Sequence, residues 1–198
     1  MYLSLFNKIF TYSKIDAQDD RFIYQPWFFS DSFKGNKKYD VSFVGSIHDN
    51  RYNYLSCLKN SQILSSKIYV YADILTFLNS FMKWKDLFTS IHFKGLDYKS
   101  YIELLGLSRA TLDIPDAEQK NITTRPIEAL GCNTKIITTN KNIINYDFYN
   151  EANIKIIDRP FELLELKEWL NQPYQQLEKS IIERYNIFNW CNEILAKI

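Results

Sequence analysis

The order of helices and strands is clearest in residues 110–139, which read ATLDIPDAEQKNITTRPIEALGCNTKIITT. Four of residues 110–114 are apolar or β-branched, as expected of a buried strand, and a proline follows them at once. Residues 125–130 carry a proline in the first turn and are followed by Gly131, which we expect to end a helix. Residues 134–139 are again rich in Ile and Thr, so this stretch predicts a strand, a helix and a second strand in succession.

The same alternation extends over most of the chain. Short runs rich in Val, Ile and aromatic residues predict strands, and longer stretches with apolar residues at helical spacing predict helices. Further strands are expected at residues 40–44, 67–71, 91–93 and 153–157, and helices from residue 50 onward, at 74–84, at 98–105 and, last, at about 187–195. Alternating strands and helices favour a parallel sheet with helices on both faces, so we predict an α/β, Rossmann-like fold.

The first 38 residues do not follow this alternation. They contain two short extended pieces, residues 8–12 and 22–24, joined through an acidic turn. We therefore expect residues 1–38 to form a lead-in that is similar to a linker between domains, and residues 39–198 to form one α/β domain.

The composition disfavours several classes of protein. Of 198 residues, 46% are hydrophobic, enough for a sizeable core. Lys and Arg number 24 against 23 Asp and Glu, and the net charge of +1 gives no global field to hold a nucleic acid. Three scattered cysteines and two histidines lack metal-ligand spacing, so no metal site is expected. No run approaches the roughly 20 apolar residues that span a bilayer, which favours a cytoplasmic protein.

Ligands of an open parallel sheet bind beyond the carboxyl ends of its strands. The loop after residues 40–44 begins with Gly45 and Ser46 and contains His48 and Arg51, groups that together can cradle a phosphate. The alternative is a simple turn followed by a solvated arginine. The sequence lacks both the P-loop pattern and G-x-G-x-x-G, which disfavours a nucleoside triphosphatase and a standard dinucleotide enzyme.

A second group of candidates lies around the predicted helix over residues 125–130. Asp113 stands at a strand end, and Thr123 or Thr124 is placed to cap the helix that follows. Arg125 can face phosphates at the start of this helix, and Glu128, about one turn further, can accept hydrogen bonds from the two hydroxyls of a ribose. Spacing alone leaves open an ordinary first-turn acid and a surface arginine.

Three stretches carry a family resemblance: KYDVSFVGS at residues 38–46, SRATLDI at 108–114 and TRPIEALGCNTKIITTN at 124–140. Together they resemble the C-terminal half of GT-B glycosyltransferases, particularly those of bacterial lipopolysaccharide and capsule synthesis. The resemblance extends over about residues 8–195, and the Glu-Ala-Leu-Gly segment before a β-branched strand is its most specific part. In that family this half holds the nucleotide-sugar donor, so the resemblance implies a single GT-B C-terminal-type domain.

The resemblance also implies roles for individual residues. Glu128 matches the glutamate that binds the donor's ribose, and Thr124 and Arg125 match positions beside the diphosphate. Gly45, Ser46 and Arg51 are placed on the opposite wall of the donor site. Residues 94–96, which include Lys94 and Gly95, are placed near the nucleobase, and Asp113 reaches the site from the end of its strand. The second glutamate of retaining members lies eight positions earlier. Here that position holds Lys120, with Glu118 two residues away, which leaves the stereochemical course open.

The length sets a further expectation. Two nucleotide-binding-like domains need roughly 300 residues, so we expect this chain to lack the acceptor domain. Three explanations stay open: a split enzyme whose other half is a separate chain, the donor domain alone, or a remnant that binds without catalysing. The partners considered are a separate acceptor-domain chain and a homo-oligomer. The leading hypothesis is a glycosyltransferase, or its donor-binding half, that transfers sugar from a nucleotide sugar to a surface polysaccharide or lipopolysaccharide. The alternative is a non-catalytic α/β binding or interaction module.

The sequence assigns no catalytic base and no cofactor; the nucleotide sugar is a substrate. His48 is the only histidine in a candidate loop, and a structural role is the simpler account of it. Because sugar acceptors are often linked to lipid, peripheral contact with the inner face of a membrane is a further hypothesis. Lys34, Lys37 and Lys38 form a basic cluster suited to it, although a solvated linker explains them more simply.

Overall fold

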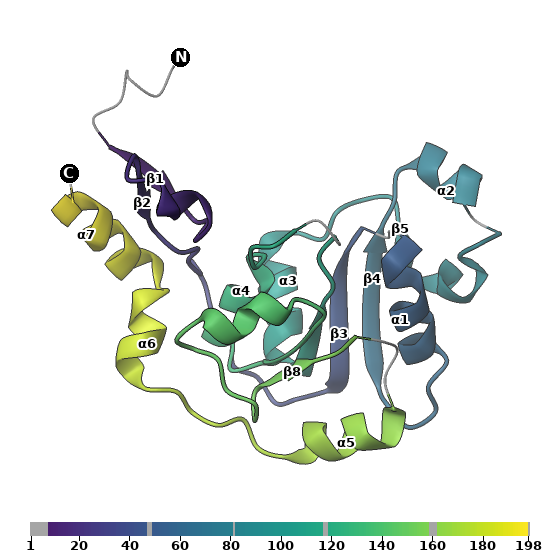
Figure 1. Cartoon of the computed structure of the whole chain (residues 1–198). Helices are drawn as coiled ribbons and strands as arrows, with labels where there is room; N and C mark the ends of the chain where they lie inside the picture. Colours follow the sequence, from purple (N-terminus) through teal and green to yellow (C-terminus); the bar gives the residue numbers. More distant parts are fainter. Residues whose placement is uncertain (1–7, 47–48, 81, 117–118, 159–161, 198) are drawn as a thin grey trace.

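A six-stranded sheet, parallel at every described pairing, forms the centre of the molecule (Figure 1). The computed structural model describes residues 8–46, 49–80, 82–116, 119–158 and 162–197. The strand order is β5-β4-β3-β6-β7-β8. Their bounds are Tyr39–Ser46 for β3, Ser66–Tyr71 for β4, Ile91–His92 for β5, Ser108–Asp113 for β6, Lys135–Thr138 for β7 and Ile154–Ile156 for β8. All six strands lie where the sequence predicts them.

Helices cover both faces of this sheet (Figure 1). On one face, α1 (Asp49–Lys59) and α5 (Leu163–Asn171) share a core cluster with the strands. On the other face lie α3 (Tyr98–Gly106) and α4 (Arg125–Gly131), which contact each other. The predicted α/β, Rossmann-like fold is therefore confirmed. The other helices are α2 (Ile74–Ser80), α6 (Lys179–Arg184) and α7 (Ile187–Lys197), with 3-10 helices at Asp16–Gln18, Lys85–Ser90 and Lys141–Asn145.

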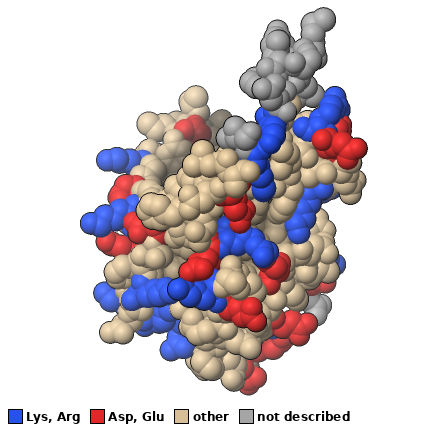
Figure 2. All heavy atoms as spheres, turned by 90° about the vertical axis from the view of Figure 1, so that its left-hand side faces the viewer, with Lys and Arg blue, Asp and Glu red and all other residues tan. Residues whose placement is uncertain are grey.

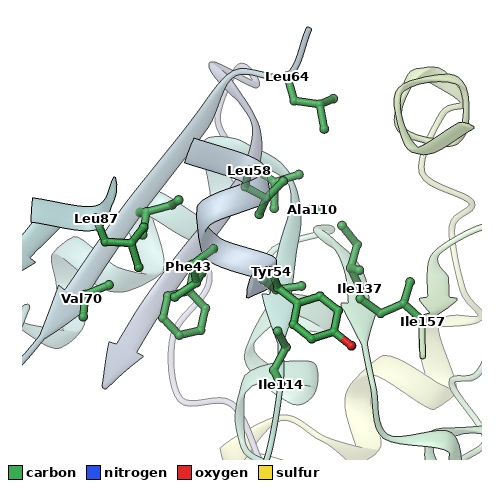
Figure 3. Close-up of a cluster of buried hydrophobic side chains, with 14 of the residues drawn as sticks. Phe43, Tyr54, Leu58, Leu64, Val70, Leu87, Ala110, Ile114, Ile137 and Ile157 are labelled. Atoms are coloured by element: carbon green, nitrogen blue, oxygen red, sulfur yellow. The ribbon is translucent and has the colours of Figure 1, made fainter. Parts of the chain in front are cut away.

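The side chains of strand β7 belong to two hydrophobic clusters, one on each face of the sheet. Ile137 belongs to the cluster with α1, and its neighbour Ile136 belongs to the cluster with α4, because successive side chains of a strand point to opposite faces. In the first cluster, Phe43 from β3 lies among side chains such as Leu58 and Val70 (Figure 3). Apolar side chains thus fill both faces, which leaves the strand ends for polar groups.

The region after β4 differs from the expectation of one helix over residues 74–84. Helix α2 ends at Ser80, and a 3-10 helix, Lys85–Ser90, follows it. The large side chains of Trp84 and Leu87 are 4% and 0% exposed and belong to the core that contains α1. Burying these two side chains turns the chain back to the sheet, which a straight helix would not do.

Helix α4 ends at Gly131, as the sequence predicts, but this glycine does not take the conformation that closes the helix. Gly131 is the last residue of the helix, and the left-handed conformation that closes it is taken by Asn133, with φ of 50°. Gly131 serves packing instead, since a Cβ there would lie 2.8 Å from Cδ2 of Phe29.

The lead-in packs against the end of the chain. Strands β1 (Ile9–Thr11) and β2 (Phe22–Tyr24) form a separate parallel pair beside α7 (Figure 1). The amide of Phe29 donates to the Tyr185 carbonyl at 2.8 Å, and Trp190 Nε1 donates to the Pro26 carbonyl at 2.6 Å. The division into residues 1–38 and 39–198 stays a prediction. On the face that carries these elements, positive and negative side chains are interspersed (Figure 2).

Candidate functional site

The two halves of the sheet separate between β3 and β6. From β3 the chain continues through β4 to β5 on one side, whereas β6, β7 and β8 lie on the other. The pairing of β3 with β6 ends at Ser42 and Thr111, but its pairing with β4 continues to Ser46 and Tyr71. The carboxyl end of β3 therefore parts from β6, and such a switch point is where open α/β sheets bind ligands.

Two arginines occupy the space between the parted strands. Arg125 Nη2 donates to the Val44 carbonyl at 2.7 Å, and its Nη1 donates to Asp113 Oδ1 at 2.9 Å. Arg51 Nη1 donates to the Ser46 carbonyl at 2.9 Å, and its Nε donates to the Ile114 carbonyl at 2.7 Å. Each guanidinium thus links β3 to the end of β6 in place of a backbone hydrogen bond.

Asp113 holds this arrangement from below. Its side chain is 1% exposed and accepts hydrogen bonds from Arg125, from the Thr123 hydroxyl at 2.8 Å and from the Thr138 hydroxyl at 3.2 Å. A carboxylate with three internal donors orients the arginine, so the structure gives Asp113 a supporting position behind the surface that a ligand would meet.

Two arginine side chains and the carboxylates of Asp113, Asp116 and Glu128 meet at this end of the sheet. The arginine side chains are 12% exposed for Arg51 and 15% for Arg125. Burial lowers the pKa of Arg51, and the charge of Arg125 lowers it further. Besides the buried Asp113, the described acid beside Arg51 is Asp116, whose side chain is 62% exposed and whose Oδ1 lies 4.0 Å from Nη2. A guanidinium group that keeps some solvent access can form charge-assisted hydrogen bonds to an anion.

Gly45 allows this close approach. A Cβ at this position would lie 3.3 Å from Arg125 Nη2 and 3.3 Å from Cζ of Phe43. The guanidinium carbon of Arg125 lies 5.3 Å from the centre of the Phe43 ring. A larger residue at Gly45 would have to displace the arginine or the ring.

Glu128 lies in the first turn of α4, next to the arginines. Its Oε2 accepts a hydrogen bond of 2.8 Å from the Tyr101 hydroxyl of α3. Burial raises the pKa of Glu128, while the Tyr101 hydrogen bond and the charge of Arg125 act to lower it. One carboxylate oxygen is therefore fixed, and the other, Oε1, is the one available to a further donor.

The structure brings together most of the residues that the sequence singles out. They are Gly45, Ser46, Arg51, Asp113, Arg125 and Glu128. Thr124 stands at the N-cap of α4 but makes no side-chain cap, and the hydroxyl of Thr123 bonds to Asp113 instead. The expectation that either threonine caps the helix is therefore wrong.

Other candidates lie apart or beyond description. Lys94 and Gly95 follow β5, the edge strand, with β4 between it and β3, and no described contact joins them to the arginine cluster. The Lys94 carbonyl accepts from the Tyr69 hydroxyl at 2.7 Å. His48 and Glu118 lie outside the described residues.

Sequence reasoning missed Tyr101. The pattern of α3 shows an apolar stripe that contains Ile102 and Leu105, both buried. Tyr101 stands at the margin of this stripe, where a tyrosine can bury its ring and direct its hydroxyl to a polar neighbour. That position was a usable signal, but its partner on α4 could be identified only from the packing of the two helices.

A polar cavity adjoins the arginines. Its volume is about 350 Å³, and Ile114 and Asp116, the neighbours of Arg51, form part of its wall. The remaining lining residues are Tyr54, Pro115, Gln119, Lys120, Thr139, Asn140, Lys141 and Asn142. Amides and ammonium groups of this kind suit a ligand rich in hydroxyl groups.

No family model and no curated protein matches the chain, whereas solved glycosyltransferase structures do. AviGT4, a glycosyltransferase of avilamycin A biosynthesis, aligns with TM-score 0.62 and 11% identity over 95% of this chain and 62% of its own. A glycosyltransferase from Rickettsia africae aligns with TM-score 0.62 and 11% identity over 98% and 65%. Anabaena HepE, solved with UDP and glucose, aligns with TM-score 0.61 and 11% identity over 96% and 62%.

These matches show the fold. The chain has the Rossmann-like α/β architecture found in GT-B glycosyltransferases, and it spans less than two thirds of the length of the three proteins. Among the described residues, no helix is long and apolar enough to cross a bilayer.

Proposed function

We propose that this chain is the donor-binding part of a glycosyltransferase and holds a nucleotide sugar at the switch point between β3 and β6. The observation that supports this most directly is the joint placement of Arg51, Arg125 and Glu128 around Gly45. The two arginines suit the diphosphate of a nucleoside diphosphate, and the carboxylate of Glu128 suits its ribose hydroxyls. Both parts are the same whichever base the nucleotide carries.

The diphosphate is assigned to the arginine side. Both guanidinium groups are already oriented by backbone carbonyls, so they need little reorganisation when a phosphate arrives. In glycosyl transfer the bond from the anomeric carbon to the β-phosphate breaks, and negative charge grows on the leaving diphosphate. Fixed positive charge in a crevice of limited solvent access stabilises that growing charge.

The ribose is assigned to Glu128. Tyr101 occupies Oε2, and Oε1 remains to accept from a ribose hydroxyl. The sugar itself would then enter the adjoining cavity of about 350 Å³, whose polar lining can bond its hydroxyls. We further propose a surface polysaccharide or lipopolysaccharide as acceptor. No metal or other cofactor takes part in the proposed binding.

Nucleotide binding tests this function. Thermal unfolding should be followed with UDP, GDP and CDP; a diphosphate at 100 times its dissociation constant should stabilise the protein by about 2.7 kcal/mol. Glu128→Ala should weaken binding at least tenfold and abolish any preference for the ribose over the 2′-deoxyribose form. Glu165→Ala, which alters a glutamate 65% exposed on α5, is the matched control. Full binding in Glu128→Ala, or no stabilisation by any of the three nucleotides, would refute the proposal.

A further inference from the structure

A second polar cavity lies beside the one that adjoins the arginines. Its volume is about 250 Å³, and Lys120 and Asn142 line both cavities. Two residues of the lead-in, Lys14 and Ile15, form part of its wall, so we call it the lead-in cavity. The remaining lining residues are Asn121, Asn145 and Tyr146. Because the two cavities share part of their walls, together they extend from the neighbourhood of Arg51 to the lead-in.

Hydrogen bonds join the two loops that line the lead-in cavity. Asn142 Nδ2 donates to the Lys120 carbonyl at 2.8 Å, and Asn140 Nδ2 donates to the Asn121 carbonyl at 3.1 Å. Lys120 and Asn121 follow β6, whereas Asn140 and Asn142 follow β7. Both loops therefore lie at the carboxyl ends of their strands, the same end of the sheet as the two arginines.

The lead-in is held against these loops by Lys14. Its ammonium group donates to the Asn145 carbonyl at 2.7 Å and lies 4.2 Å from the centre of the Tyr146 ring. Figure 1 shows the lead-in on the side of the molecule where α4 lies, away from α1 and α2. Three segments that are distant in sequence thus form the cavity by their own contacts, so little ordering is needed when a ligand binds.

The side-chain amides of Asn121 and Asn145 are available to a ligand. The backbone carbonyls of these residues accept the hydrogen bonds described above, but within the described part of the chain no hydrogen bond engages either side-chain amide. Gln119, in the wall of the neighbouring cavity, carries a third amide of this kind. An amide offers both N–H donors and a carbonyl acceptor, which matches a hydroxyl group that donates and accepts. These side chains therefore suit a ligand with many hydroxyl groups.

The lining of the lead-in cavity disfavours other classes of ligand. Among its described lining residues, only Ile15 and Tyr146 are large and apolar or aromatic, and Tyr146 is 7% exposed. A protein partner normally seats apolar or aromatic anchors in a pocket, and this lining offers them little contact. Lys14 is already engaged, and Lys120 is the one other charged residue in the described lining. One such cation holds a nucleic acid or another polyanion only weakly.

We propose that the lead-in cavity is a subsite for the acceptor, and that the acceptor held there is a saccharide. This inference rests on the proposed function, which assigns the neighbouring cavity to the transferred sugar. The acceptor must bring a hydroxyl group to the anomeric carbon of that sugar, so it has to lie beside it. The lead-in cavity meets this condition, because it shares Lys120 and Asn142 with the sugar's cavity. The lead-in thereby gives this chain a part in acceptor binding as well as in donor binding.

Calorimetric titration with saccharides, in the absence of nucleotide, tests the subsite. The probes are maltotetraose, cellotetraose and chitotetraose, each compared with its monosaccharide. We expect at least one tetrasaccharide to bind about tenfold more tightly than its monosaccharide, because it can fill both cavities. Asn121→Ala with Asn145→Ala should weaken that binding about tenfold, as expected for the loss of two hydrogen bonds. The matched control is Asn171→Ala with Gln172→Ala, two exposed amides that line a separate cavity at the end of α5, and it should bind as the unaltered chain does.

Further measurements separate the subsite from its rivals and from the donor site. No binding of any of the three tetrasaccharides, or equal loss in Asn121→Ala with Asn145→Ala and in its control, would overturn the subsite. So would sedimentation showing an oligomer that Asn121→Ala with Asn145→Ala dissociates, since the lead-in cavity would then join protein chains. UDP binding should be unchanged in this variant. A chain that binds UDP but no saccharide would keep the donor site and lose the subsite, whereas the reverse would refute the donor site and with it the acceptor role.

Discussion

Cations lie at both ends of the strands of the central sheet, but their hydrogen-bond partners differ. We call the end at which the strands begin the amino edge and the end at which they finish the carboxyl edge. At the amino edge, Lys37 donates to the Gly106 carbonyl at 3.1 Å, Lys135 to the Trp169 carbonyl at 2.7 Å, and Arg109 to the Leu170 carbonyl at 3.4 Å. These carbonyls lie at the carboxyl-terminal ends of α3 and α5, where helices leave acceptors unpaired and carry partial negative charge. At the carboxyl edge, Arg51 and Arg125 bond strand carbonyls instead.

We interpret this difference as one between structural cations and the cations that we propose to bind the ligand. The amino edge encloses a cavity of about 240 Å³ lined by Lys37, Arg109 and Lys135, so a count of cations alone would favour it as an anion site. Burial lowers the pKa of Lys37 and of Lys135 to about 8, and the charge of Arg109 adds to this. These cations serve helix ends, and no glutamate like Glu128 stands among the cavity's lining residues. The carboxyl edge combines cations with a hydroxyl-binding group.

The largest expected effect is on the free energy of unfolding, when the aspartates that pair with cations at the two edges, Asp113 and Asp40, are replaced. Asp113→Ala should cost about 3–5 kcal/mol of unfolding free energy, because it leaves the largely buried Arg125 without its carboxylate. Asp40, at the amino edge, pairs with Lys167 and Arg109, whose side chains are 35% and 42% exposed. Asp40→Ala should therefore cost at most about 2 kcal/mol. Urea unfolding of both variants measures the difference, and equal losses would remove the distinction between the edges.

A smaller effect is expected from Tyr101→Phe. Loss of a hydrogen bond to a charged group should weaken nucleotide binding by about 1.5 kcal/mol, or roughly tenfold. Because that hydrogen bond acts to lower the pKa of Glu128, its removal should raise this pKa. A carboxylate is lost as pH falls through its pKa, so binding by the variant should fail at a higher pH than binding by the unaltered chain.

Calorimetric titration of Tyr101→Phe over a range of acidic pH checks both points. Tyr98→Phe is the matched control, since Tyr98 lies on the same helix and its hydroxyl pairs with Ser30 at 3.1 Å. If the pH dependence of binding were the same in both variants, Tyr101 would be a packing residue only.

The smallest effect is expected at the amino edge. Lys135→Met should change the unfolding free energy by no more than about 1 kcal/mol at pH 7, because an apolar side chain of similar length replaces a desolvated charge. Burial lowers the pKa of Lys135 from 10.5 to about 8, so the unfolded chain binds more protons between these values. The unfavourable contribution of Lys135 therefore disappears as pH rises through that window.

Urea unfolding at several pH values checks this sign. The unaltered chain should gain stability relative to Lys135→Met between about pH 8 and 10.5. Nucleotide binding should be equal in the two proteins. Weaker binding by Lys135→Met would give the amino edge a part in the site after all.

The sequence predicts the strands well, and it places several candidate site residues at strand ends, for a physical reason. The strands are short runs in which β-branched, aromatic or other apolar residues recur, and Gly45 and Asp113 stand at strand ends, which parallel topology brings to one edge. The side-chain partners could not be predicted in the same way. Arg125 turns toward Val44 because β3 and β6 part, and that divergence depends on how the two halves of the sheet pack.

One local prediction is wrong, and another is right for a different reason than the local pattern suggests. Periodicity extends α2 through Trp84, but tertiary packing of that side chain ends the helix earlier. The glycine that looks like a helix stop, Gly131, is required by the ring of Phe29, about a hundred residues away in sequence. In the first place the burial of Trp84, and in the second the ring of the distant Phe29, decides what a local pattern cannot.

The contact between the lead-in and the last helices has a practical consequence. The Phe29 amide bonds the Tyr185 carbonyl, the Ile187 amide bonds the Phe29 carbonyl, and Trp190 bonds Pro26. Trimming either terminus to obtain a smaller protein would strip the other of its partner and uncover aromatic rings. A shortened version should therefore keep both segments. Because these hydrogen bonds join the lead-in to the last helices, a label on α7 also reports motion of the lead-in.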